Sequence, residues 1–175
     1  MKITIFWLAW SGTSTIWKLL TRELNYTFMS SWNIMRQWAK ESGYTIYEFE
    51  DKIVKKDDSF DIKLDKKVEE FWKNNDNFIF ESRLAWNFIA DSFKIFLHCD
   101  ELERYKRINN REWLFIDEII FKTKKRESEL VERYLKIYPN IKFPPIKEEF
   151  DLFIDSTEKQ PEEIIKIILN NLEKN

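Results

Sequence analysis

Glycine and hydroxyl residues follow the first apolar segment of the chain. The run Ser11-Gly12-Thr13-Ser14-Thr15 comes after residues 2–6, whose β-branched residues predict a buried strand, and before a stretch with helical apolar spacing. Backbone N–H groups and the dipole at such a helix start favour a phosphate, and a first-turn hydroxyl can bind Mg²⁺. Only part of the pattern G-x-x-x-x-G-K-[ST] is present, so the run alone fits a phosphate loop or a simple Ser/Thr helix cap.

Arginine residues recur at spacings that predict shared helix faces. They lie three and four residues apart between 104 and 111, and seven residues apart at 126 and 133. Guanidinium groups fork onto phosphate oxygens, although such stripes are also typical of solvated faces paired with glutamates. The candidates for anion binding are Arg36, Arg83, Arg104, Arg107, Arg111, Arg126 and Arg133.

Short apolar segments alternate with helical segments along the whole chain. Strands are predicted at residues 2–6, 27–29, 77–81, 93–99 and 150–155. Helices are predicted from residue 13, and at 33–41, 45–73, 100–111, 116–138 and 161–172. This alternation favours an α/β fold whose parallel sheet is covered on both faces.

Composition excludes several classes of protein. The chain has 175 residues, enough for one domain, and a net charge of -2, which gives no overall footprint for nucleic acid or anionic membrane. One cysteine and one histidine exclude an internal disulfide and a multi-histidine metal centre, and His98 and Cys99 are interpreted as core residues. We find no signal peptide or membrane-spanning run, and expect a cytoplasmic protein.

Five motifs together resemble the short, archaeal-type cytidylate kinases among the P-loop nucleoside monophosphate kinases. The stretch MKITIFWLAWSGTSTIWKLLTRELNY is similar to the family's first strand, phosphate loop and first helix. That loop has the form G-x-x-G-S-G-T-[ST]-[ST], with threonine where most P-loops have lysine. SSWNIMRQWAKESG resembles the monophosphate-side helix, FESRLAW the turn E-G-R-L-A-G, ERYKRINNREW the helix ending in R-E-G, and TKKRESELVERY the lid helix.

The resemblance covers the chain from Met1 to about Leu172 and implies its fold and activity. The implied fold is a three-layer P-loop NTPase domain over residues 1–175, with a five-stranded parallel sheet flanked by helices. Helical segments for the monophosphate, at about 31–73, and for a lid, at about 113–139, belong to it. The implied activity is ATP- and Mg²⁺-dependent phosphorylation of CMP, and of dCMP, by a monomer whose partners are small molecules.

The same resemblance implies roles for individual residues. The donor nucleotide's phosphates would lie on a loop made of Trp7, Leu8, Ala9, Trp10, Ser11, Gly12, Thr13, Ser14 and Thr15, with Ser14 on Mg²⁺. Arg107 or Arg111 would assist near the adenine or the phosphates. Catalysis would fall to Thr13 and to the lid residues Arg126 and Arg133, which close over the transferring group. The acceptor's phosphate would be held by Asn33, Arg36 and Arg83.

Tryptophan stands where the family pattern has glycine, at Trp7, Trp10, Trp32, Trp86 and Trp113. The chain has 8 tryptophans and 2 glycines, where an average composition gives about 12 glycines. One hypothesis is that the gene uses UGA for glycine and was translated with UGA as tryptophan. Trp17, Trp38 and Trp72 are weaker tests of this hypothesis, because they lie in predicted helices where the family tolerates small or apolar residues. One alternative is that the tryptophans are real and the protein is a catalytically dead P-loop fold that serves as a binding or scaffold module. A second is that the tryptophans merely fill the core, although their placement in polar turns argues against this.

Other departures from the family pattern affect the acceptor side. Asn33 replaces an acidic residue, Ser82 replaces the glycine of E-G-R, and Lys66 and Lys67 stand where arginines are usual. These changes leave the choice among CMP, UMP and AMP open.

Overall fold

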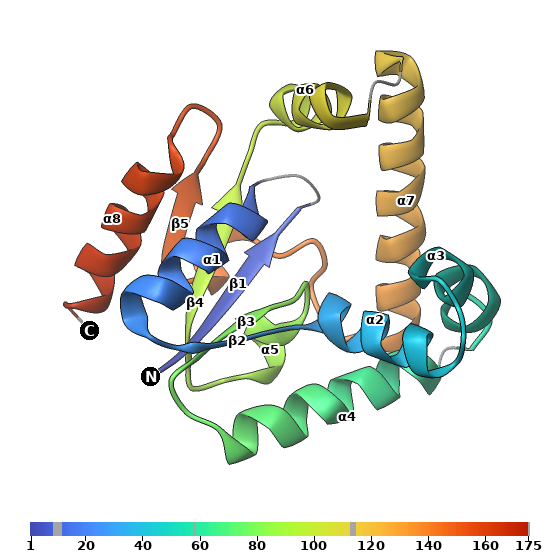
Figure 1. The fold of residues 1–175 in the computed structure, drawn as a ribbon, viewed down its shortest axis with the longest axis horizontal. Helices are drawn as coiled ribbons and strands as arrows, with labels where there is room; N and C mark the ends of the chain where they lie inside the picture. Colours follow the sequence, from blue (N-terminus) through green and yellow to red (C-terminus); the bar gives the residue numbers. More distant parts are fainter. Residues whose placement is uncertain (9–11, 58, 113–114, 175) are drawn as a thin grey trace. The chain divides into compact units, whose positions relative to one another are not determined.

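The computed structural model describes residues 1–8, 12–57, 59–112 and 115–174, with only the helical backbone for 111 and 112. Its strands are β1 (Lys2–Trp7), β2 (Thr27–Ser30), β3 (Phe78–Glu81), β4 (Ser92–His98) and β5 (Leu152–Asp155). They form one parallel sheet in the order β2-β3-β1-β4-β5, as the alternating pattern predicts (Figure 1). Phe78, Ile79 and Phe80 are fully buried, as expected where helices cover both faces.

Helices connect the strands within a few residues of the predicted bounds. They are α1 (Thr13–Leu24), α2 (Ser31–Glu41), α3 (Ile46–Phe49), the π-helical η1 (Glu50–Val54), α4 (Ser59–Asn74), α5 (Ala85–Phe88), α6 (Glu101–Glu112), α7 (Ile116–Ile137), the 3₁₀-helical η2 (Lys147–Glu149) and α8 (Pro161–Leu172). The segment 45–73, expected to be mostly helical, is divided into α3, η1 and α4. Among the described residues, no helix is both long and apolar enough to cross a membrane.

The chain groups into two compact units. Unit 1 contains Met1–Phe6 and Trp17–Ile95, and unit 2 contains Trp7–Ile16 and Phe96–Asn175. The single kinase domain inferred from the resemblance stays a prediction.

In unit 1, the parallel register brings the carboxyl ends of β2 and β3 level, beside Ile5 of β1. Ile5 of β1 and Ser30 of β2 both lie opposite Glu81 of β3. Thr4 and Ser92 satisfy each other's buried hydroxyl groups at 2.9 Å, which removes the cost of polar atoms inside the sheet. Every segment that leaves these strands therefore starts from one edge.

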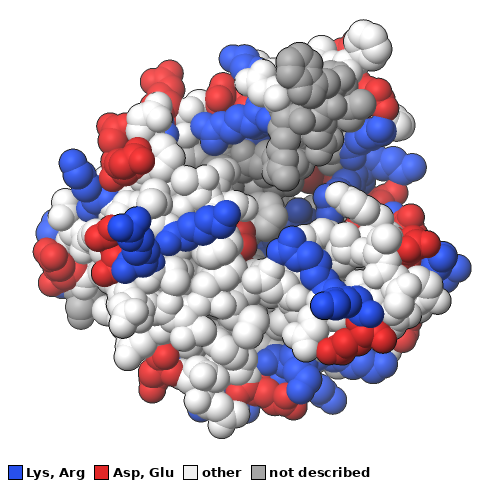
Figure 2. Space-filling view, in the orientation of Figure 1, with Lys and Arg blue, Asp and Glu red and all other residues white. Residues whose placement is uncertain are grey.

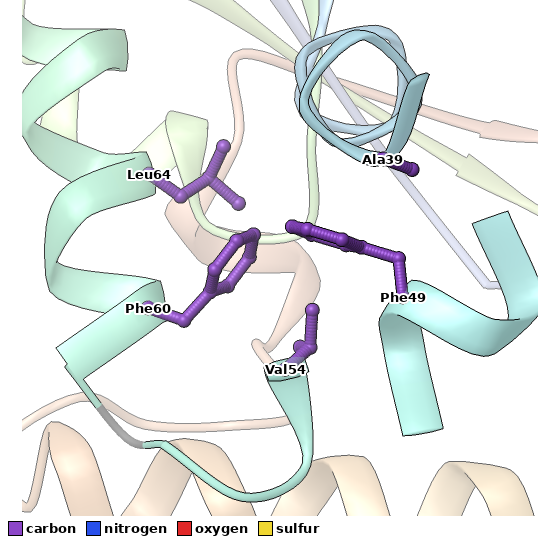
Figure 3. Packing of buried hydrophobic residues seen from close by; sticks show 5 residues of the cluster. All are labelled: Ala39, Phe49, Val54, Phe60 and Leu64. Atoms are coloured by element: carbon purple, nitrogen blue, oxygen red, sulfur yellow. The ribbon is translucent and has the colours of Figure 1, made fainter. Parts of the chain in front are cut away.

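The helices that follow β2 have an apolar cluster of their own. Figure 3 shows Ala39, Phe49, Val54, Phe60 and Leu64 pointing toward one another from α2, α3, η1 and α4. Phe49 meets Phe60 edge to face, with ring centroids 5.5 Å apart. Such aromatic pairs contribute about 0.5–1.5 kcal/mol beyond their burial. The packing of these helices against one another is therefore stabilised by apolar side chains that the helices themselves contribute.

In unit 2, helices pack in two places. Ile164, Ile165 and Ile168 are the buried face of α8, which lies beside β5 (Figure 1). Tyr105 and Ile108 of α6 pack with Ile119 of α7. This packing fixes α7, the helix that resembles the lid, against α6.

One buried carboxyl group in unit 1 has no hydrogen-bond partner for one of its oxygens. Asp65 lies on α4, and its Oδ2 atom is buried and unsatisfied among the described residues. Burial, and then the charge of Asp61, raise the pKa of Asp65 to about 7. A carboxyl group in an unfolded chain has a pKa of about 3.9. Between these values the folded state binds the extra proton, so stability falls as the pH rises through this window.

We predict that Asp65→Asn removes this loss. The variant should gain stability over the parent by about 2–4 kcal/mol near pH 8, and by much less near pH 5, because asparagine carries no charge at either pH. Urea unfolding at both pH values measures the difference. Asp51→Asn is the control, since Asp51 is exposed and a hydrogen bond from Lys55 lowers its pKa. A gain for Asp65→Asn that is the same at both pH values would contradict the prediction.

Candidate active site

The start of α1 places a glycine and three hydroxyl groups at a helix N-terminus. Gly12 has a φ of +90°, which favours glycine, and its carbonyl accepts a hydrogen bond from the Thr15 backbone N–H at 3.2 Å. Thr13 is buried, whereas Ser14 and Thr15 are exposed in the first turn. This is the arrangement that binds a phosphate through backbone N–H groups and the helix dipole.

Part of the predicted loop lies outside the described residues. Ala9, Trp10 and Ser11 fall there, and so does Trp113. Trp7 is the last residue of β1 and is half-buried, and Leu8 follows it. Binding of phosphate by the loop as a whole therefore stays a prediction.

A pocket of about 330 Å³ in unit 2 adjoins this helix start. Gly12 and Thr15 line one side, Glu103 and Arg107 of α6 another, and Ser156 and Thr157 after β5 a third. Ile16 and Ile164 add apolar surface. Most of the lining is polar or charged, including Glu158, Lys159 and Gln160, with a smaller apolar part. Such a pocket can hold a polar small molecule through a few fixed polar groups.

Arg107 is the best-anchored side chain of this pocket. Its Nη2 donates to the carbonyl oxygens of Ser156 at 3.1 Å and Thr157 at 3.2 Å, and its Nε donates to Glu103 at 3.3 Å. The sequence pointed to Arg107, and the structure brings it to the loop. The side chain of Arg111, its predicted alternative, lies outside the described residues.

The turn after β5 is held by its own hydrogen bonds. Thr157 donates to Asp155 from its hydroxyl and, at 3.0 Å, from its backbone N–H. These hydrogen bonds lower the pKa of Asp155, and the bond from the Thr157 hydroxyl has the larger effect. The Thr157 hydroxyl also accepts from the backbone N–H of Asp100 at 2.9 Å, which joins this turn to the start of α6. Burial raises the pKa of the nearby Cys99 thiol, which is a core residue as predicted.

Arg104 has a different role from its neighbour on α6. It is 3 % exposed, and its Nη1 lies 2.6 Å from Glu127 on α7. Arg126 and Arg133 lie on the same helix α7, the first exposed and the second half-buried. This partly buried ion pair therefore restrains the rotation of the helix that bears both predicted catalytic arginines. Their contact with a substrate stays a prediction.

In unit 1, the predicted acceptor residues gather at the common edge of the sheet. Ser30 caps α2 by accepting from the Asn33 backbone N–H at 3.0 Å, and the Asn33 side chain accepts from Arg36. Arg83 follows β3. The strand paired with β3 is β2, and α2 begins directly after it. Ligands of parallel sheets bind beyond the carboxyl ends of strands, so this edge suits an anionic substrate.

Ser82 has a structural role that explains its difference from the family pattern. Its hydroxyl accepts from the Leu84 backbone N–H at 3.3 Å, and its backbone N–H donates to the Ile5 carbonyl at 3.4 Å. Serine side chains stabilise such turns by hydrogen bonds to the backbone two residues on.

The sequence did not indicate Ser156 and Thr157 as site residues, and it indicated Glu103 only as a partner for a solvated arginine face. A glutamate four residues before an arginine is an ordinary helix pair, and a Ser-Thr pair is an ordinary turn. One signal was available: Ser156 and Thr157 follow the last strand, at the end where parallel sheets bind ligands.

Comparison with known proteins identifies the family of this chain. A family model described as an AAA domain matches residues 8–133. The cytidylate kinase of Methanobrevibacter smithii is 36% identical over 172 residues, which cover 98% of each chain. That of Methanosarcina mazei is 34% identical over 179 aligned positions and also covers 98% of each. The chain belongs to the cytidylate kinase family. It is accordingly a phosphotransferase, and its substrates are small nucleotides.

The fold is shared more widely than the cytidylate kinase family. The shikimate kinase of Aquifex aeolicus superposes with a TM-score of 0.62 at 24% identity, over 99% of this chain and 96% of that one. This likeness confirms the predicted P-loop kinase fold and the five-stranded parallel sheet. The alternative of a catalytically dead scaffold has no support in these comparisons.

Two glycines with positive φ test how the pocket depends on Gly12. Gly12→Ala and Gly43→Ala should each lower the free energy of unfolding by about 1 kcal/mol or more, because both positions have positive φ. A Cβ at Gly12 would lie 3.5 Å from Arg107 Nη1, whereas a Cβ at Gly43 would have no neighbour within 4 Å.

We therefore predict that only Gly12→Ala weakens the thermal stabilisation that ATP confers, because the methyl group takes up space beside the pocket. Thermal unfolding with and without ATP measures both effects. Equal responses of the two variants to ATP would contradict the role of Gly12.

Proposed function

We propose that this protein transfers the γ-phosphoryl group of ATP to CMP, giving ADP and CDP, and that dCMP is also an acceptor. The near-full-length similarity to proteins named cytidylate kinase carries the choice of acceptor. The helix start at Gly12 and the adjoining pocket support a nucleotide donor on unit 2.

On the donor side, the N-terminus of α1 holds phosphate groups and the pocket takes the adenine ring. Arg107 lines this pocket with its position fixed by three acceptors. Ser14 is exposed in the first turn of α1, so its hydroxyl is free of the helix core and fits a Mg²⁺ ligand. Magnesium typically takes one or two protein oxygens, its other ligands being water and substrate phosphates. When bound, it neutralises charge on the phosphates.

On the acceptor side, Asn33, Arg36 and Arg83 bind the monophosphate. Asn33 and Arg36 lie on α2, which begins where β2 ends, and Arg83 follows the neighbouring strand β3. Guanidinium groups suit a dianionic phosphate because they donate pairs of parallel hydrogen bonds.

The chemical step needs no covalent intermediate. The attacking phosphate oxygen of CMP forms a bond to the γ-phosphorus as the bond to the ADP oxygen breaks. Arg126 and Arg133 stabilise the charge on the transferring group, and Thr13 supports the loop. Closure of the lid excludes water, which would otherwise accept the phosphoryl group.

The proposal is tested by supplying the purified protein with Mg²⁺-ATP and, separately, CMP, dCMP, UMP or AMP. We expect ADP to form fastest with CMP, and kcat/KM for CMP and dCMP to exceed that for UMP and AMP about tenfold or more. Arg126→Lys keeps the charge but not the forked geometry, and should lower kcat by about 10²-fold. Faster turnover of UMP or AMP would assign another base, and absence of acceptor-dependent ADP would refute the kinase proposal.

We also propose that glycine is the native residue at Trp7 and Trp10. Trp7→Gly/Trp10→Gly should raise kcat/KM for ATP about tenfold or more, because glycine lets the backbone approach phosphate closely. Phe60→Ala is the control, since Phe60 is buried, meets Trp38 edge to face at 5.3 Å and lies outside the loop. That change should lower stability by about 3 kcal/mol without raising activity. No gain from the double variant would contradict the proposal, as would tryptophan at residue 7 in spectra of the protein from its own source.

A further inference from the structure

We propose that Glu103 is a positioning residue that fixes Arg107 for the donor nucleotide and so sets the affinity for ATP, without a part in binding the acceptor. The inference rests on the proposed function, which assigns the pocket of unit 2 to the donor.

The hydrogen bonds of Arg107 restrain its guanidinium group along one edge. Nε donates to Glu103 Oε1, and Nη2 donates to the carbonyl oxygens of Ser156 and Thr157. Glu103 holds Nε, whereas both carbonyl contacts are made through Nη2. Restraints on two different nitrogens define the plane of the guanidinium group, which a single restraint would leave free to rotate.

The other end of the same group reaches the phosphate loop. Nη1 of Arg107 lies 3.5 Å from the place where a Cβ on Gly12 would be. Arg107 therefore extends from the turn after β5 to the start of α1, along the pocket wall. When the guanidinium group is held in place, it presents a flat, charged face to the donor nucleotide. Without these restraints the side chain would be disordered.

Glu103 is well placed for this role by its spacing. It precedes Arg107 by four residues on α6, the order that favours a glutamate–arginine pair on a helix. A free arginine side chain loses much rotational entropy when it becomes ordered, so anchoring it before the ligand arrives improves affinity.

The charge of Glu103 would otherwise be unfavourable here. A carboxylate in the pocket beside the start of α1 repels the nearby phosphates of the donor nucleotide, unless a cation neutralises the carboxylate. Arg107 does so at 3.3 Å, and Lys106 lies 3.7 Å from the second oxygen of Glu103. It follows that the effect of losing Glu103 depends on whether Arg107 is present.

A solvent-exposed ion pair with no role in function is the competing explanation. The side chains of Glu103 and Arg107 are each 30% exposed, and pairs of this kind often contribute nothing measurable to stability. The two explanations differ in what they predict for nucleotide affinity, not in what they predict for folding.

The experiment is a double-mutant cycle with Glu103→Gln, Arg107→Gln and the combination of both. Kd for ATP is measured by calorimetry, and KM for ATP and CMP and kcat by turnover. A salt concentration of about 0.2 M screens charge effects that act at a distance. Glu118→Gln is the matched control, since Glu118 pairs with Lys122 at the same spacing on α7. Glu103→Asp keeps the charge on a shorter side chain.

We expect Glu103→Gln and Glu103→Asp to raise Kd and KM for ATP about five- to tenfold, with KM for CMP, kcat and Tm nearly unchanged. In the Arg107→Gln background, Glu103→Gln should cause no further loss, and should improve binding by removing an unpaired negative charge. Glu118→Gln should match the parent.

Two results would overturn the inference. One is a KM for ATP that stays within twofold of the parent in both Glu103 variants. The other is an equal loss with and without Arg107. Failure of the parent protein itself to bind ATP and phosphorylate CMP would instead refute the proposed function, and this is seen before any variant is made.

Discussion

The common register of β1, β2 and β3 is the constraint on which the acceptor side of this molecule depends. Because Ile5 and Ser30 both lie opposite Glu81, β2 and β3 end level, and β1 continues beyond them to Trp7. At this edge of the sheet, β2 is followed by α2 and β3 is followed by the turn that contains Arg83. A slip of one residue would turn the buried side chains of β3 toward the opposite face. Phe78, Ile79 and Phe80 are buried on both faces of the sheet, so a slip would exchange aromatic and branched side chains between two packed layers, at a cost in packing.

The strands and helices followed from the sequence because their signals are local. Runs such as residues 77–81 are apolar, short and bounded by polar residues, and α8 has isoleucines at helical spacing after Pro161. The division of 45–73 into three helices was not foreseen, because charged residues there mask the short turn that precedes α4. Capping of α3 by Thr45 and Glu48 is a local signal that could have marked one boundary.

The candidate site was only partly predictable, for a different reason. Arg107 could be named from its resemblance to a family motif, but its anchors could not, since Ser156 and Thr157 are distant in sequence and act through backbone carbonyl groups. Side-chain identity carries no information about a carbonyl acceptor. Arg104 was placed on the same face as Arg107 by spacing, yet it turns toward Glu127 inside the protein. Surface charge gives little further guidance, since acidic and basic side chains are intermingled on the face shown in Figure 2.

The tryptophans illustrate how differently one residue type can fit. Trp86 is 5% exposed and its indole N–H donates to the Arg83 carbonyl at 3.0 Å, while Trp17 stacks on Phe28 with centroids 3.6 Å apart. Large rings are thus accommodated in several helices. At the end of β1, however, the proposed phosphate loop requires the chain to approach phosphate closely, and a side chain of any size works against that.

Ile34 lies between Asn33 and Arg36 on α2 and packs against two clusters at once. One cluster is formed by the helices around Phe49 and Phe60, and the other lies on β3 around Phe78 and Phe80. Side chains shared by two packed groups transmit force between them, because neither group can shift without disturbing the common contact. A tilt of the helical cluster relative to the sheet would therefore displace Ile34, and with it Asn33 and Arg36, which lie within one turn of it on α2.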